Sequence, residues 1–185
     1  FAARHKVLKL EPVELTPREL PPALRRGDVD LALVGVSDPA LRREFNVRVV
    51  STYAVLLALG AAHPLAKRRK LKLSELRDAE WITWDEREFP GRKQGLVHAC
   101  RAAGFRPRIV FQTDSMASLF VQVATSQAIG HVVPQTRRMP HDGVVFAEID
   151  PPESFMSEMN VAWRRADPRA RLIEELVAEM GAMRA

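Results

Sequence analysis

The sequence predicts an α/β protein, because segments with the pattern of buried strands alternate with segments that have the pattern of helices. Residues 29–35 (VDLALVG) form an almost continuous apolar run, which is typical of a strand covered on both faces. Residues 116–123 instead repeat apolar side chains at the spacing of a helix with one buried face. Neither an internal repeat nor a low-complexity linker interrupts this alternation.

The chain is expected to begin with a strand followed by a short helix. Residues 7–15 (VLKLEPVEL) alternate between apolar and polar side chains, as a half-exposed strand does. The helix is expected to start at Pro21 or Pro22, where the missing backbone N–H costs nothing. It is expected to end at Arg26, because Gly27 can adopt the positive φ of a helix terminus.

The remaining elements follow from the same patterns. Apart from 29–35, strands are expected at 45–50, 54–60, 81–84, 108–113, 131–134, 144–149 and 159–163, and 108–113 has the pattern of a buried strand. Helices are expected at 93–104, from 116 onward and after Asp167-Pro168, whose residues suit an N-cap and a first turn. Asp114 or Ser115 is expected to cap the helix that starts at 116.

The composition predicts a compact protein outside the membrane. A chain of 185 residues is long enough to bury a hydrophobic core and to form one or two domains. Its longest uncharged apolar run, residues 53–62, is shorter than the roughly 18 residues of a membrane span, and no signal peptide is visible. The single cysteine, Cys100, excludes an intrachain disulfide and suits a reducing, cytoplasmic compartment.

The net charge of +5 raises the question of nucleic-acid binding, because lysine and arginine neutralise phosphates. Outside residues 67–72 (KRRKLK), however, the basic residues are scattered among 23 acidic ones, and only 6% of the chain is aromatic. The basic segment is interpreted either as a solvated loop or as an aid to DNA or partner contact in an intact protein. The chain itself is not expected to bind DNA tightly.

No pattern in the sequence predicts catalysis, a metal site or a cofactor. The acidic residues of 84–89 alternate with Arg87, which favours a solvated loop over a pair of catalytic carboxylates. His98 and Cys100 are two residues apart on an expected helix and therefore lie on different faces. Ser115 lacks the G-x-S-x-G motif of hydrolases, and no phosphate-binding glycine motif is present.

A ligand site is expected where strands give way to helices, because helix N-termini offer free N–H groups to anions. The residues at such junctions are Thr16, Ser37, Thr113, Asp114 and Ser115. For Thr16, Asp114 and Ser115, simple helix capping is an equally good interpretation, and Thr16 has the capping-box spacing with Glu19.

The segment after the strand at 81–84 could complete this site. Trp84 and Phe89 could form an apolar wall, and the guanidinium of Arg87 matches a carboxylate in shape and charge. For the two aromatic residues, packing in the core is an equally good interpretation. Together these residues predict an anionic ligand with an apolar body.

Two segments resemble the effector-binding domain of LysR-type transcriptional regulators. Residues 24–35 (LRRGDVDLALVG) match its helix-to-strand turn, and residues 57–66 (LALGAAHPLA) match a strand that ends in His-Pro-Leu where the chain crosses between subdomains. Further matches lie, in the order of the family, at 37–43 (SDPALRR), 73–82 (LSELRDAEWI), 103–115 (AGFRPRIVFQTDS) and 132–134 (VVP). The resemblance thus covers nearly the whole chain. One departure is the segment 126–134 (SQAIGHVVP), which has one glycine where the family usually has a pair.

The resemblance implies a type 2 periplasmic-binding-protein-like fold, with two Rossmann-like lobes joined by crossover strands. Lobe I would comprise residues 1–65 and 159–185, and lobe II residues 66–158. The family's first strand would precede Phe1, so the sequence is expected to be a fragment.

The resemblance also implies a function. A small organic acid, either aromatic or an unsaturated dicarboxylate, would bind between the lobes, because residues 37–43 resemble the branch that senses intermediates of aromatic catabolism. The domain would form a homodimer, and the intact protein a tetramer that binds DNA through an N-terminal winged helix-turn-helix. The alternative is a periplasmic solute-binding protein of the same fold, and an enzyme is a third class.

Overall fold

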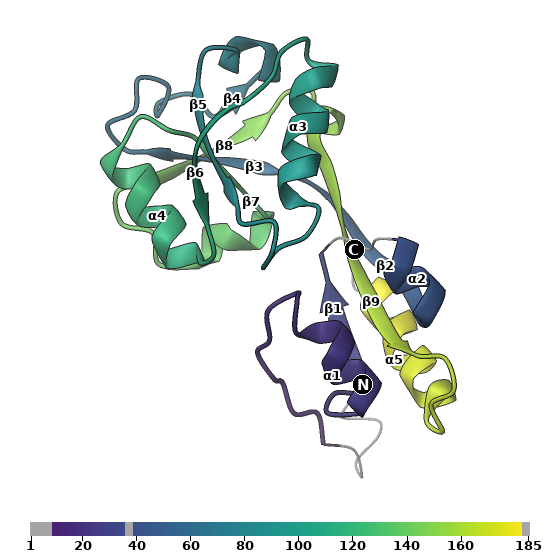
Figure 1. Cartoon of the computed structure of the whole chain (residues 1–185). Coiled ribbons are helices and arrows are strands. Elements are labelled where there is room, and N and C mark those ends of the chain that lie inside the picture. Colours follow the sequence, from purple (N-terminus) through teal and green to yellow (C-terminus); the bar gives the residue numbers. More distant parts are fainter. Residues whose placement is uncertain (1–8, 36–38, 183–185) are drawn as a thin grey trace. The chain divides into compact units, whose positions relative to one another are not determined.

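The computed structural model describes residues 9–35 and 39–182, which divide into two compact units (Figure 1). Unit 1 combines the chain up to Thr52 with the chain from Glu158, and unit 2 is the continuous segment Tyr53–Ser157. The first boundary expected from the sequence lies later, after Leu65. In the structure, the strand Leu56–Gly60 already pairs with two other strands of unit 2.

Unit 1 is built on a three-stranded sheet in the order β1-β9-β2. Its strands are β1 (Leu31–Val34), β2 (Phe45–Ala54) and β9 (Met156–Arg164). Strand β1 pairs antiparallel with β9, from Leu31 opposite Trp163 to Val34 opposite Asn160. The helices are α1 (Leu20–Arg26), α2 (Pro39–Glu44) and α5 (Ala170–Ala182).

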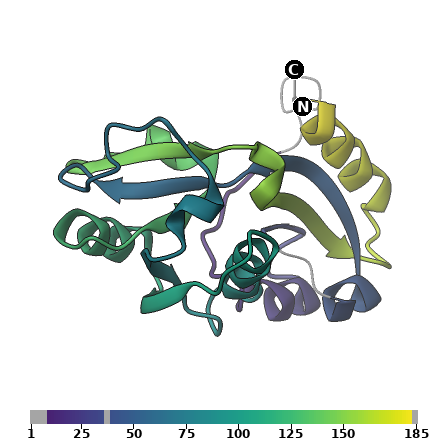
Figure 2. The same cartoon turned by 90° about the horizontal axis from the view of Figure 1, so that it is seen from above.

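Strand β9 has a hydrophobic cluster on each of its faces, because successive side chains of a strand point to opposite sides. Ala162 packs with Leu24 of α1 and Leu41 of α2. Its neighbours Val161 and Trp163 pack with residues of α5. Figure 2 accordingly shows α5 on one side of β9 and α1 on the other.

The start of the chain differs from its prediction. Residues 9–15 form no strand, and Leu10 and Val13 are exposed. Pro12 lacks the backbone N–H that a strand would donate to its neighbour, which disfavours a strand in this segment. Strand β1 is also not covered on both faces, because the side chain of Leu33 is 51% exposed.

Helix α1 confirms its prediction. It has proline in its first turn and ends at Arg26, and the following Gly27 has a φ of 79° and donates its backbone N–H to Leu24 O. Thr16 and Glu19 form the expected side-chain contact just before the helix. The N–H and Oγ1 of Thr16 donate to Glu19 Oε2 at 2.8 and 3.0 Å.

Unit 2 contains a four-stranded sheet and a pair of parallel strands. Strands β4 (Lys70–Leu71), β8 (Val144–Ile149), β3 (Leu56–Gly60) and β7 (Gly130–Val132) are hydrogen-bonded in that order. Strands β5 (Glu80–Trp84) and β6 (Arg108–Thr113) form a parallel pair. Ile129 joins the two groups, because its O accepts from Ile82 N and its N–H donates to Glu80 O.

The other elements of unit 2 are helices α3 (Arg92–Ala102) and α4 (Met116–Thr125), and the short 3-10 helices η1 (Leu73–Leu76), η2 (Pro134–Arg138) and η3 (Pro152–Phe155). Strands β2, β3, β5, β7, β8 and β9 and helices α3, α4 and α5 confirm their predictions. Strand β6 is mostly exposed and not buried as expected: Phe111 is 47% exposed, because β6 lies at the sheet edge with β5 as its one paired neighbour.

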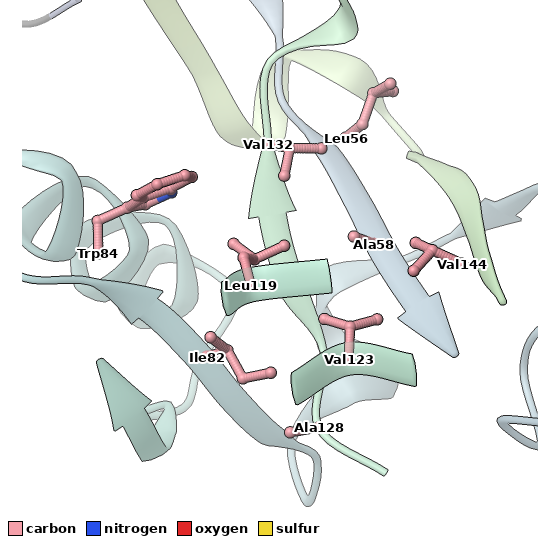
Figure 3. Close-up of a cluster of buried hydrophobic side chains, with 9 residues drawn as sticks. All are labelled: Leu56, Ala58, Ile82, Trp84, Leu119, Val123, Ala128, Val132 and Val144. Carbon is pink, nitrogen blue, oxygen red and sulfur yellow. The ribbon is translucent and has the colours of Figure 1, made fainter. Parts of the chain in front are cut away.

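The core of unit 2 lies between α4 and the sheet. Leu119 and Val123 of α4 point at Ile82 and Ala58 (Figure 3). The close approach of α4 depends on Gly60, because a Cβ there would lie 2.6 Å from the carbonyl oxygen of Val123. The apolar stripe predicted for this helix is therefore its buried face.

The segment with the single glycine forms a regular strand. Strand β7 starts at Gly130, and its residues pair antiparallel with β3. A Cβ at Gly130 would lie 3.1 Å from Cδ2 of Leu119 and 3.2 Å from Cγ2 of Val123, so this glycine also makes room for α4. Within residues 9–35 and 39–182, no helix has the length and apolar character needed to cross a membrane.

Candidate ligand-binding edge of unit 2

Strands β5 and β6 run parallel and end side by side, which brings most of the predicted site residues together. Trp84 lies opposite Thr113, and Asp85 N donates to Thr113 O at 2.8 Å. Helix α4 starts shortly after β6. We call this place, residues 84–91 and 113–117, the ligand edge. Thr16 belongs to unit 1, and Ser37 lies outside the described residues.

Ser115 is the N-cap of α4, as predicted for Asp114 or Ser115. Its Oγ accepts the backbone N–H of Ser118 at 3.2 Å. Because the hydroxyl acts as acceptor in this bond, its hydrogen stays available to a ligand. The N–H groups of Met116 and Ala117, in the first turn, have no acceptor within the helix. Ser115 and Ala117 are exposed and Met116 is half-buried, so this turn lies at the surface of unit 2.

Thr113 holds the turn before α4. It is 3% exposed, and its Oγ1 donates to Ser115 O at 3.0 Å. The same oxygen accepts a longer bond from Ser115 N at 3.4 Å. The hydroxyl of Thr113 therefore positions Ser115. Asp114 is exposed and does not cap the helix.

Arg87 is held by a residue of its own loop. Its Nε and Nη2 donate to Asp85 at 3.2 and 2.9 Å, and its backbone N–H donates to Oδ1 of Asp85 at 2.8 Å. These hydrogen bonds lower the pKa of Asp85 to about 2. The side chain of Arg87 is 83% exposed, and so exposed an ion pair contributes little to stability. A ligand carboxylate would have to compete with Asp85 for this guanidinium.

Trp84 and Phe89 pack against each other, with ring centroids 4.8 Å apart. Trp84 belongs to the buried cluster shown in Figure 3, and its Nε1 donates to His131 O at 3.1 Å. Phe89 is partly buried against the same cluster. Of the two interpretations given for these residues, the packing contacts support the core, and Phe89 keeps some surface at the ligand edge.

The loop after β5 also provides a hydrogen-bond acceptor at the start of α3. Oε1 of Glu86 accepts the backbone N–H of Gly91, the N-cap of that helix. A carboxylate of the chain thus occupies the start of α3, whereas the cap of α4 is a neutral hydroxyl. Between these two helices, the start of α4 is the better place for an anion.

Sequence reasoning missed a buried polar pair next to this edge. The Nε2 of His131 in β7 lies 3.1 Å from Oγ1 of Thr83 in β5. His131 is 2% exposed, and burial lowers its pKa to about 3, with a smaller contribution from the charge of Arg92. Its ring is therefore neutral at pH 7. The available signal was a histidine inside an apolar segment, residues 128–133 (AIGHVV).

The structure shows no thiol or metal chemistry within its described residues. Cys100 on α3 is fully buried, and this burial raises the pKa of its thiol to about 12. A thiol with such a pKa forms almost no reactive thiolate. Among residues 9–35 and 39–182, no group of three or more histidine, cysteine, aspartate or glutamate side chains could hold a metal ion.

Comparison with protein families gives one match that spans the chain. Residues 1–184 match the family described as the LysR substrate binding domain. The chain belongs to this family. Its fold is the type 2 periplasmic-binding-protein-like fold of LysR effector-binding domains, as the resemblance implied.

The curated relatives of this LysR domain are transcriptional regulators. The chain is 26% identical over 180 residues to the HTH-type transcriptional regulator BudR of Raoultella terrigena, covering 96% of this chain and 60% of BudR. It is 22% identical over 157 residues to the HTH-type transcriptional regulator AlsR of Bacillus subtilis (strain 168), covering 84% of this chain and 49% of AlsR. The chain thus spans about half to three fifths of the length of these relatives.

Solved structures of LysR-family proteins have the same fold. CbnR, a LysR family transcriptional regulator, superposes with a TM-score of 0.83 at 14% identity, covering 97% of this chain and 62% of CbnR. The C-terminal domain of a probable LysR family regulator from Rhodococcus sp. RHA1 gives a TM-score of 0.74 at 25% identity, covering 96% of this chain and 87% of that domain.

Proposed function

We propose that this LysR domain is the effector-sensing part of a cytoplasmic transcription regulator and that its ligand is a small organic acid. The family and the curated regulators support the sensing role. Nothing in the comparisons supports the alternative of a periplasmic solute-binding protein, and the matched regulators give no support to an enzyme.

The observation that supports an acid as the ligand is the group of hydrogen-bond donors at the start of α4. The hydroxyl hydrogen of Ser115 and the first N–H groups of the helix are unused in the structure, and the helix dipole adds a partial positive charge. A carboxylate accepts such bonds and is stabilised by that charge. A neutral ligand would gain much less from this arrangement.

The apolar surroundings favour a flat or short ligand body. Phe89 and Met116 are partly buried beside the core cluster. Met116 directly follows Ser115 in the chain, and Phe89 packs against Trp84, which lies opposite Thr113. An aromatic acid or an unsaturated dicarboxylate would place its carboxylate on Ser115 and its apolar atoms against these side chains. Thr16, Ser37 and Arg87 remain further candidates for contacts with this ligand.

In the intact protein, the ligand would act by favouring one conformation of the domain. A ligand shifts such an equilibrium only through a difference in affinity between the two conformations. We propose a homodimer for this domain and a tetramer for the intact regulator, which would bind DNA through an N-terminal winged helix-turn-helix. The chain alone would bind DNA weakly and with a strong dependence on salt.

Two substitutions at Ser115 test the ligand class. Ser115→Asp and Ser115→Asn both keep a good N-cap, so the helix remains capped in each variant. Only the aspartate puts a negative charge where the carboxylate would bind. We expect benzoate or cis,cis-muconate to raise the melting temperature of the unmodified chain and of Ser115→Asn, and to bind Ser115→Asp at least tenfold more weakly, since a charge-assisted bond is worth about 1.5–3 kcal/mol.

Thermal-shift titration measures these affinities, with benzamide as the neutral control. Stabilisation by benzamide equal to that by benzoate would contradict the anion site. Unchanged acid binding by Ser115→Asp would show that the acid binds elsewhere. Absence of stabilisation by both acids would exclude this ligand class.

A further inference from the structure

A cavity in unit 2 shares no lining residue with the ligand edge. It has a volume of about 240 Å³. Its wall comes from the first residues of unit 2, from β4, from η2, from the end of β8 and from the start of η3. The lining side chains that matter here are Leu56, Lys70, Pro134, Arg137, Glu148 and Ile149.

The charged part of this cavity has an excess of one positive charge. Lys70 in β4 is the register partner of Glu148 in the parallel strand β8. Arg137 of η2 reaches Oε1 of Glu148 with both terminal nitrogens, at 3.4 Å each. One carboxylate thus faces two cationic side chains, and these three are the charged residues of the cavity wall.

Neither cation is firmly engaged. Charge-assisted bonds between nitrogen and oxygen usually measure about 2.7–2.9 Å, so the contacts of Arg137 are long. The side chains of Arg137 and Glu148 are 43% and 47% exposed, which weakens their attraction further. Lys70 takes part in no ion pair with another described residue of the chain. Both cations can therefore turn to a ligand without breaking a strong contact.

The rest of the wall is apolar and fixed by backbone pairing. Leu56 and Ile149 are buried, and Leu56 is held in β3 between β7 and β8. The strand β8 is fixed on its other side, because Glu148 N donates to Arg69 O at 2.8 Å and Asp150 N donates to Leu71 O at 2.9 Å. The cavity thus combines an apolar wall on hydrogen-bonded strands with two exposed cations, and small-molecule sites are likewise mostly apolar with a few polar groups.

We propose that this cavity binds a small apolar monocarboxylate, with its carboxylate between Lys70 and Arg137. One net positive charge matches one carboxylate, and the apolar wall takes the hydrocarbon part. A cavity of about 240 Å³ is small among ligand pockets, so it suits a short ligand. The ligand would contact Val55, close to the point where the chain passes from unit 1 to unit 2, so that occupancy there can act on the connecting strand.

The test uses hexanoate and its neutral analogue hexanamide, which have similar size and differ in charge. Titration of the isotope-labelled chain is followed by two-dimensional amide NMR. We expect hexanoate to shift the signals of Val55, Leu56 and Ile149, and hexanamide to bind at least tenfold more weakly. Equal binding of the two compounds, or hexanoate shifts confined to other residues, would overturn the proposal.

Matched charge variants test the two cations. The double variant Lys70→Gln/Arg137→Gln should lose at least tenfold in hexanoate affinity. The control Lys67→Gln/Arg138→Gln removes the same charge from exposed neighbours outside the cavity and should stay within twofold. An equal loss of hexanoate affinity in both variants would show that only the overall charge of the chain matters, and it would contradict the site. Ser115→Asp should leave hexanoate shifts at Val55 unchanged, so this proposal and the ligand edge can fail separately.

Discussion

Strand β3 of unit 2 and strand β1 of unit 1 differ in how many neighbouring strands they have. In unit 2, β3 has a strand on each side, and its residues Leu56–Gly60 are all buried. In unit 1, β1 pairs with β9 alone and leaves Leu33 exposed, and the preceding residues 9–15 form no strand. Of these two strands, the one with a neighbour on each side is buried on both faces, and the one paired on a single side is buried on one face only.

The largest difference in stability should appear when one leucine of each unit is replaced by alanine. Leu119→Ala removes a fully buried side chain from the cluster under α4, and such changes cost about 2–5 kcal/mol. Leu33→Ala removes an exposed side chain and should cost less than about 0.5 kcal/mol. Urea denaturation gives the two losses, and hydrogen exchange should assign the larger one to peptides of unit 2. Similar losses of stability in the two variants would contradict the difference in burial between Leu119 and Leu33.

A pair of glycines sharpens the comparison. Gly60→Ala places a Cβ against backbone of α4, and overpacking of this kind costs about 1–3 kcal/mol. Gly181→Ala in α5 meets nothing within 4 Å and should stabilise the chain by about 0.5–1 kcal/mol, because alanine is the better helix former. Melting curves of the two variants should move in opposite directions. A loss at Gly181 would show that α5 has less room than described.

A third effect appears only in acid. At pH above 6.5, His131 is neutral in the folded and the unfolded chain. As the pH falls toward the folded pKa of about 3, only the unfolded chain takes up a proton, so the free energy of unfolding decreases by up to about 1.4 kcal/mol per pH unit.

His131→Gln should therefore flatten the pH dependence of stability between pH 6 and 4. This window lies above the ordinary pKa of Asp85, whose own loss of stability begins below 3.8. Urea midpoints at several pH values provide the measurement. The same slope in the variant would mean that His131 does not carry the acid sensitivity.

Local patterns predicted the elements whose signals lie within a few residues. The cap of α4, predicted at Asp114 or Ser115 and found at Ser115, the stripe of Leu119 and Val123, and the glycine after α1 each depend on residues within or next to a single helix, and the structure confirms them. The exposure of β6 could not be predicted in this way, because it depends on which strand lies at the edge of the sheet. Composition alone does not distinguish an edge strand from a central one.

The candidate site was predicted only in part, because some of its contacts depend on loop conformation and strand order. The sequence identified the junction at Thr113–Ser115, but not that Arg87 pairs with Asp85, because a loop conformation decides which charges meet. Nor did it identify the contact of His131 with Thr83, since 48 residues separate them in the chain. Such contacts follow from strand order, which a single sequence does not contain.

The inert Cys100 makes the chain a convenient host for spectroscopic labels. A thiol that is buried and has a pKa of about 12 will not compete for a maleimide dye at neutral pH. New cysteines at the exposed positions Leu33 in unit 1 and Val121 in unit 2 would therefore react alone. Energy transfer between dyes at these two positions would follow the separation of the units directly as benzoate, muconate or hexanoate is added.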